Sequence, residues 1–300
     1  MEYALLLIAD FLYSLMFLTN RGYQRKNGTG LSSALTFTFF TSIFSLLIFL
    51  ALAAVAMISG LEVLSEFTLE FSWLSLLFAL LSALVIIGYS FFSIKALGVA
   101  NLSLFSIFAM LGGMLLPSVY GLIFSGEDVT WGKIACYALI IVALALTFEK
   151  GKQGKKALIY CFGVFVLNGM SGVVTSIHKE AIFKDVAVNS GSFMIMGRAI
   201  SILLCFFLVL IVTKRLPKIR LSDFGNVAGN AACGGMGNLL QYLVLATFTL
   251  GSSVLFPIVT GGTMLFSMIV SIVIGEKPKA KTIIASVIAA ASTVLMLLPF

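Results

Sequence analysis

Residues 96–128 read ALGVANLSLFSIFAMLGGMLLPSVYGLIFSGED, and residues 246–277, a shift of 150 positions, read ATFTLGSSVLFPIVTGGTMLFSMIVSIVIGEK. The matched positions include Ala96 and Ala246, Ser103 and Ser253, Gly112 and Gly262, Met114 and Met264, and the Gly-Glu pairs 126–127 and 275–276. A chance match would not keep apolar segments, small residues and a Gly-Glu pair in the same order. The repeat therefore predicts a chain built from two copies of one unit.

The composition assigns this repeat to a membrane protein. Of the 300 residues, 60% are hydrophobic and 10% are charged, and the mean hydropathy is +1.13. Soluble domains carry about 25% charged residues, and apolar runs of 18 or more residues are typical of transmembrane helices. A soluble globular protein is therefore excluded. The net charge of +7 comes from short basic clusters beside apolar runs, so we expect a lipid bilayer and no nucleic acid as partner.

A twenty-residue hydropathy window predicts ten transmembrane helices joined by short connections. Their expected ranges are 3–19, 31–58, 71–94, 99–124, 131–148, 157–177, 190–212, 224–247, 251–274 and 281–298. Each copy then holds five helices, and because five is odd the second copy enters the membrane from the opposite side. The predicted fold is an all-α integral membrane protein with ten transmembrane helices in two inverted five-helix repeats, residues 1–149 and 150–300.

The loop charges support this inversion. The loop after the second helix has no Lys or Arg, whereas its counterpart after the seventh has Lys214, Arg215, Lys218 and Arg220. Fifteen basic residues fall near loops on one side of the predicted membrane, and three, Lys133, Lys179 and Lys184, fall on the other. Because cytoplasmic loops are enriched in Lys and Arg, the charges predict that both termini lie outside the cell.

The chain resembles the drug/metabolite transporter superfamily, EamA-like branch. The likeness rests on the ten helices in inverted halves, the ninth-helix segment FPIVTGGTMLFSMIVSIVIGEKP at 256–278, and a Gly-Glu pair before the last helix of each half. It covers the whole chain and is strongest in 96–148 and 246–298. The resemblance implies a plasma-membrane permease that moves small metabolites by alternating access, through a cavity built mainly from helices 1, 3, 4, 6, 8 and 9. It also implies cytoplasmic termini, which is opposite to the orientation that the loop charges predict.

Two charged residues fall inside the expected helices, where insertion scales put their cost at about 2.5–3.5 kcal/mol. Asp10 and Arg198 lie at similar depths from the same membrane face. Asp10 is a candidate for binding a substrate cation or a coupling proton, since both would compete for one negative charge. Arg198 is a candidate for binding a carboxylate or phosphate. The alternatives are a structural ion pair, or an arginine that reaches the lipid head groups.

Polar residues recur at helical spacing in two other segments. Asn168, Ser171 and Thr175 share one face of the sixth helix, and Asn226, Asn230, Asn238 and Gln241 form a stripe on the eighth. Such side chains either line a cavity or hold helices together by hydrogen bonds. Tyr13, Phe17, Tyr89 and Phe92 are candidates for an aromatic wall. The candidate substrate-binding residues are Asp10, Tyr13, Tyr89, Asn168, Ser171, Thr175, Arg198, Asn230, Asn238 and Gln241.

The remaining motifs are interpreted as structural. Gly112-Gly113 and Gly261-Gly262, with Pro117 and Pro257, favour close helix crossings and hinges in the fourth and ninth helices. Glu127 and Glu276 precede the last helix of each half, where a negative charge favours a helix N-terminus. Four cysteines, Cys136, Cys161, Cys205 and Cys233, lie singly in apolar segments. We therefore expect no metal site and no cofactor.

Several functions fit these features. We expect a secondary transporter, because no ATP-binding motif is present, with protons as candidate coupling ions and an amino-acid-like zwitterion favoured as substrate. An organic cation, quaternary amine or drug bound by Asp10 and aromatic rings is the first alternative. A lipid carrier, or an intramembrane serine protease using Ser171 and His178 in the segment GMSG at 169–172, is a further hypothesis. We expect no enzyme activity, and either a monomer or a homodimer.

Overall fold

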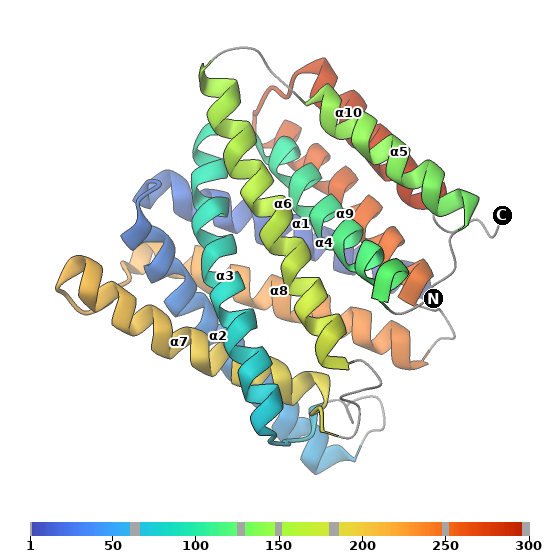
Figure 1. Cartoon of the computed structure of the whole chain (residues 1–300). Coiled ribbons are helices and arrows are strands. Elements are labelled where there is room, and N and C mark those ends of the chain that lie inside the picture. Colours follow the sequence, from blue (N-terminus) through green and yellow to red (C-terminus); the bar gives the residue numbers. More distant parts are fainter. Residues whose placement is uncertain are drawn as a thin grey trace.

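The computed structural model describes residues 2–60, 67–124, 130–147, 152–179, 186–247 and 252–295, which fold into ten α-helices without a β-strand (Figure 1). The helices are α1 (Glu2–Asn27), α2 (Leu31–Ser59), α3 (Trp73–Val99), α4 (Leu102–Phe124), α5 (Trp131–Leu146), α6 (Lys152–Lys179), α7 (Ser190–Thr213), α8 (Leu221–Thr247), α9 (Ser252–Val273) and α10 (Ala280–Leu295). The all-α class predicted from the sequence is therefore confirmed.

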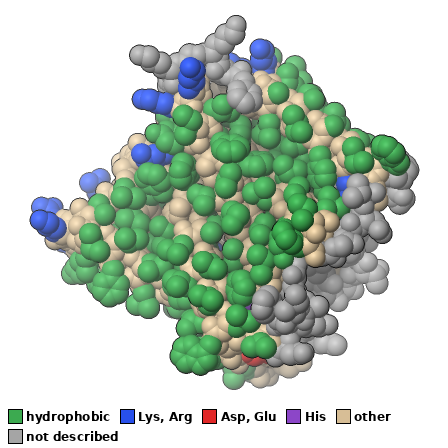
Figure 2. All heavy atoms as spheres, in the orientation of Figure 1, with side chains coloured by type: hydrophobic (Ala, Val, Ile, Leu, Met, Phe, Trp, Pro, Cys, Tyr) green, Lys and Arg blue, Asp and Glu red, His purple; other side chains and the backbone are tan. Residues whose placement is uncertain are grey.

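The outer surface of the bundle is apolar. Six helices, α1 to α4, α6 and α7, are long and apolar enough to cross a membrane, and α5, α10 and residues 258–273 of α9 are shorter apolar helices. Figure 2 shows one face nearly covered by hydrophobic side chains, with Lys and Arg mainly at its upper and left edges. A soluble protein does not expose so large an apolar surface, whereas lipid is its natural solvent. The protein is thus a membrane-embedded helical bundle.

Helices from the two parts of the chain pack against each other. α1 contacts α8 and α9, α6 contacts α3 and α4, α2 contacts α7, and α5 contacts α10. In Figure 1 α5 and α10 lie side by side at one edge of the bundle, while α3 and α6 run side by side through its middle. Each half of the chain therefore contributes helices to contacts with the other half.

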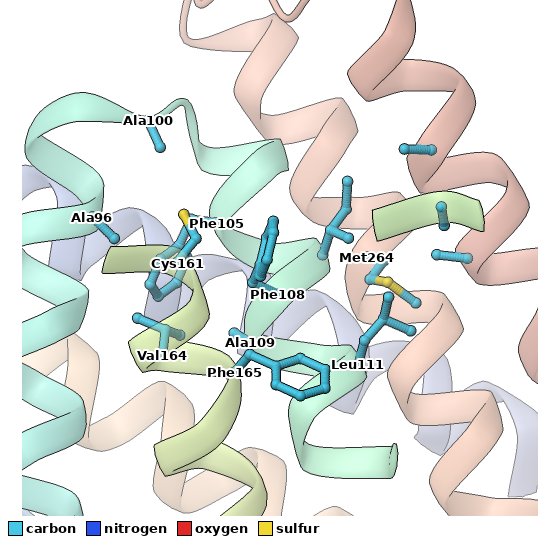
Figure 3. Close-up of a cluster of buried hydrophobic side chains, with 14 of the residues drawn as sticks. Ala96, Ala100, Phe105, Phe108, Ala109, Leu111, Cys161, Val164, Phe165 and Met264 are labelled. Atoms are coloured by element: carbon cyan, nitrogen blue, oxygen red, sulfur yellow. The ribbon is translucent and has the colours of Figure 1, made fainter. Parts of the chain in front are cut away.

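The α4–α6 crossing is closely packed because glycine leaves room for the other backbone. A Cβ atom at Gly112 would lie 2.7 Å from the Cα atom of Phe165, and one at Gly169 would lie 2.6 Å from the carbonyl oxygen of Gly112. Figure 3 shows Phe105, Phe108 and Phe165 packed beside this crossing. Small residues at a helix crossing have the role that the sequence predicted for them.

The α1–α9 crossing has the same construction. A Cβ atom at Gly262 of α9 would overlap the carboxylate of Asp10 in α1, and a Cβ atom at Gly113 of α4 would lie 2.6 Å from Nδ2 of Asn168 in α6. In both crossings a polar side chain of one helix, Asp10 of α1 or Asn168 of α6, therefore lies directly against a glycine of the other helix.

Helix ends differ from the predicted ranges. α1 continues to Asn27, beyond the predicted end at residue 19, so that Arg21 and Arg25 are helical rather than in a loop. The apolar window ends where polar side chains begin, but backbone hydrogen bonds continue past that point. At the end of α2 the backbone of Gly60 has φ 62°, and its amide donates to the carbonyl of Ala56, which closes the helix.

Gly112→Ala is expected to lower the melting temperature of the detergent-solubilised protein. The new methyl group meets the Phe165 backbone, which cannot move aside like a flexible side chain, and overpacking of this kind costs about 1–3 kcal/mol. Gly225→Ala in α8 is the matched control, since nothing lies within 4 Å of its Cβ position. A Gly112→Ala variant that melts at or above the wild-type temperature would contradict the close crossing.

Candidate functional site

A cavity of about 220 Å³ lies among α2, α3, α6, α7 and α8. Its lining residues are Phe49, Ser82, Ile86, Ser171, Thr175, Ser190, Phe193, Met194, Gly197, Arg198 and Asn238. The family resemblance implied a cavity built mainly from helices 1, 3, 4, 6, 8 and 9. Of these, α3, α6 and α8 line the cavity, and α2 and α7 line it in addition. α7 contributes most because Ser190, Met194 and Arg198 repeat every four residues and Phe193 and Gly197 lie on the same face.

The start of α7 is held by the segment that precedes α3. Asn189 caps the helix, since its Oδ1 accepts from the amide of Ser192 at 2.8 Å, and its Nδ2 donates to the carbonyl of Thr68 at 2.7 Å. Oε2 of Glu70 accepts from the amide of Asn189 at 2.8 Å. These bonds fix the first turn of α7, and with it the direction in which Arg198 projects about 12 Å further along the helix.

Arg198 is the one charged side chain among the described residues that line the cavity. Within the ranges that the structure describes, no carboxylate lies within ion-pair distance of its guanidinium group, and neither Asp10 nor Glu276 pairs with it. The side chain is partly exposed, and it is one of the residues that line the cavity. The structural ion pair considered for Arg198 and Asp10 is therefore not formed.

Asn238, Ser171 and Thr175 line the same cavity. The Tyr13 hydroxyl donates to Oδ1 of Asn238 at 2.7 Å, which connects α1 to the cavity wall. The Thr175 hydroxyl donates to the Ser171 carbonyl at 3.0 Å. The structure thus brings four of the predicted site residues together, with Tyr13 behind one of them.

Two other predicted site residues hold helices together. Nδ2 of Asn168 donates to the carbonyl of Ala109 in α4 at 2.6 Å, and Nδ2 of Asn230 donates to the carbonyl of Met16 in α1 at 2.8 Å. Tyr89 is partly buried and packs against the main hydrophobic cluster. The side chain of Gln241 lies outside the described residues.

Asp10 lies outside the cavity, at the α1–α9 crossing. It is fully buried, and its Oδ1 accepts from the Thr263 hydroxyl at 3.4 Å. Its Oδ2 has no hydrogen-bond partner among the residues that the structure describes. A substrate in the cavity would not touch this carboxyl group, since Asp10 is not a lining residue.

An ion network that the sequence analysis did not find lies at the basic end of the bundle. Oε1 of Glu276 is 2.6 Å from Nη2 of Arg21 and 3.3 Å from Nη2 of Arg25. Its Oε2 accepts from the Leu102 amide at 2.7 Å and from the Ser271 hydroxyl at 2.8 Å. Arg21 also donates to the Ala100 carbonyl at 2.8 Å. The network joins α1, the α3–α4 link and the end of α9.

The position of Glu276 differs from the one expected. It binds the first amide of α4, where the helix dipole favours a negative charge, instead of serving the first turn of α10. Its repeat counterpart, Glu127, lies outside the described residues. The repeated Gly-Glu pair drew attention to Glu276 in the sequence. Its pairing with Arg21 could not be predicted, because the two residues lie far apart in the chain.

His178 is paired with a serine other than the one considered for a protease. Its Nε2 lies 2.8 Å from Oγ of Ser75 in α3, which also accepts from the Val188 amide at 3.1 Å. Both side chains are fully buried, and the His178 ring stacks on Phe193. The described residues contain no group of three His, Cys, Asp or Glu side chains that could hold a metal ion.

No protein-family model matches the sequence, and no curated protein matches it. A solved structure described only as "Crystal structure of protein" is similar to the chain, with a TM-score of 0.62 and 16% sequence identity. The alignment covers 98% of this chain and 97% of that chain. At this identity the likeness concerns the fold alone, and it extends over nearly the whole of both chains.

Glu276→Gln is expected to lower the melting temperature, with a loss of about 3 kcal/mol, because it leaves Arg21 charged and without its carboxylate. Arg21→Gln should also be less stable, and the double variant should lose less than the sum of the two. The control is Lys277→Gln, an exposed neighbouring charge. Strict additivity of the two single losses would show that Arg21 and Glu276 do not interact.

Proposed function

We propose that the protein is a secondary transporter that moves a small metabolite across the plasma membrane by alternating access. The observation that carries this proposal is the polar cavity around Arg198 inside an apolar helical bundle. A charged residue within a membrane helix is costly and serves as a functional hypothesis by default. The cavity of about 220 Å³ is smaller than the roughly 300–1,000 Å³ of drug-sized sites, which favours a small metabolite over a drug.

We further propose that the chain spans the membrane ten times, as two inverted repeats of residues 1–149 and 150–300. If each helix is replaced by its counterpart in the other repeat, five positions along the chain, the α1–α8 contact becomes the α6–α3 contact and the α1–α9 contact becomes the α6–α4 contact. All four of these contacts are present in the structure. It also turns the pair Asp10 and Gly262 into Asn168 and Gly113, a polar residue against a glycine that is one position beyond Gly112, the repeat counterpart of Gly262. Inverted repeats around a midplane site are common in secondary transporters, and they support a place in the drug/metabolite transporter superfamily, EamA-like branch.

The charge distribution supports an orientation. Basic residues lie at the C-terminal ends of α1 and α7, as with Arg25, Lys26 and Lys214, so the N-terminal ends of these helices lie away from this basic end. If Lys and Arg face the cytoplasm, the cavity residue Ser190 belongs to the outer half of the protein. Asp10, which lacks a cationic partner, remains the candidate for coupling transport to protons.

Two-sided access to one residue tests this function without a known substrate. With the four native cysteines replaced by alanine, Ser171→Cys in the cavity is expected to react with a membrane-impermeant methanethiosulfonate from either side of sealed, oriented vesicles. Alternating access predicts this result because each state opens the cavity to one side only. The measurement is the extent of labelling from each side.

Two variants serve as controls. Ser222→Cys, exposed at the start of α8, should react from one side only, and Ala285→Cys, fully buried in α10, should not react. If Ser171→Cys reacts from a single side under all conditions, alternating access through this cavity is wrong.

A further inference from the structure

We propose that the cavity binds the carboxylate of a small metabolite of net negative charge, and that Arg198 is the anion-binding group. This inference rests on the proposed transport function and names its substrate class. It differs from the zwitterion that the sequence favoured, and from the organic cation that was its alternative.

The charge of the cavity wall is the first argument. The described lining residues include one cation, Arg198, and no Asp or Glu. The carboxyl group of Asp10, which both earlier hypotheses needed near the ligand, is buried between α1 and α9 and does not line the cavity. An ammonium group entering here would meet a positive charge without a carboxylate to balance it. A carboxylate would instead supply the anionic partner that Arg198 does not have among the described residues.

The hydrogen-bonding groups give the second argument. A guanidinium group presents donors in a planar fork that fits both oxygens of a carboxylate. The Tyr13 hydroxyl donates to the carbonyl oxygen of Asn238, and this bond uses neither hydrogen of the Asn238 amide NH₂, which can donate to a ligand. Arg198 and Asn238 are therefore both donors, which suits an anion. The Thr175 oxygen, whose proton is used by the Ser171 carbonyl, can accept from a hydroxyl group of the ligand.

The remaining wall limits the rest of the ligand. Phe49, Ile86, Phe193 and Met194 surround the polar groups with apolar surface. A cavity of about 220 Å³ with such a wall accommodates a short hydrocarbon part next to the carboxylate, and it excludes drug-sized anions. Short-chain monocarboxylates and hydroxy acids fit these limits.

The experiment measures binding to the purified full-length protein in detergent, by calorimetry and by the shift in melting temperature. The probes are acetate, lactate, succinate, inorganic phosphate, alanine and tetraethylammonium. At least one carboxylate is expected to bind more tightly than alanine and tetraethylammonium. Arg198→Gln should weaken that binding at least about tenfold, the loss expected when a charged hydrogen bond is removed. Arg198→Lys should retain part of it.

The controls separate loss of binding from loss of folding. Arg215→Gln removes an exposed arginine just after α7 and should leave carboxylate binding unchanged. Without ligand, Arg198→Gln should melt no lower than the wild type, because it removes a charge within a membrane helix that pairs with no carboxylate among the described residues. The proposal is overturned if no carboxylate binds, if alanine or tetraethylammonium binds as tightly, or if Arg198→Gln binds like the wild type.

Two further outcomes identify the source of the anion. If phosphate binds and no carboxylate does, the carboxylate assignment is overturned. If added phosphatidylglycerol competes with carboxylate binding, the assignment is also overturned, and the site is assigned to a lipid head group. Two-sided labelling of Ser171→Cys in the Arg198→Gln background separates the two proposals. If Ser171→Cys is labelled from both sides in the Arg198→Gln background and the wild-type protein binds no carboxylate, the proposed transport function stands and only the substrate class is wrong.

Discussion

The close approach of helix backbones at glycine is the constraint on which the rest of the bundle depends. Gly112 lets α4 lie against the backbone of α6, and Gly262 lets α9 lie against Asp10 of α1. Both crossings join helices from different halves of the chain, so they fix α1 and α6 relative to the opposite half. The cavity lies between α6 and helices α2, α3, α7 and α8, so the α4–α6 crossing helps to position one of its walls. A larger residue at Gly112 would displace α6, which lines the cavity, as well as a core contact.

The two charged residues inside the helices, Asp10 and Arg198, differ in how the free-energy cost of burying a charge can be reduced. Asp10 is enclosed by packed helices, and a carboxyl group without a cationic partner can avoid the cost of a buried charge by holding a proton. A guanidinium group stays charged in proteins, so Arg198 cannot use that solution. It requires polar surroundings or an anion, and the cavity provides space for one. Asp10 and Arg198, which the sequence places at similar depths, therefore lie in different surroundings.

The sequence located the helices well because long apolar runs with short connections leave little ambiguity. Each of the ten expected segments coincides with a helix, and the errors lie at polar ends such as residues 20–27 of α1. The site was harder to predict, because Asn238 and Asn230 share one residue type and one stripe. Asn238 lines the cavity, whereas Asn230 donates to a backbone carbonyl of α1. Only the positions of neighbouring helices distinguish these uses, and the same holds for Arg21 and Glu276, which lie far apart in sequence.

The two ends of the bundle are held by different kinds of interaction. At the basic end, Glu276 binds two guanidinium groups, a hydroxyl and the first amide of α4. Near Ser190, α3 and α6 are joined by the hydrogen bond between Ser75 and His178, whose ring stacks on Phe193, and the Asn189 amide donates to Glu70. Separating charges in a low-dielectric interior costs more than separating neutral hydrogen bonds. The ion pairs of Glu276 therefore make the basic end harder to separate than the hydrogen bond and the ring contact that join α3 and α6 near Ser190.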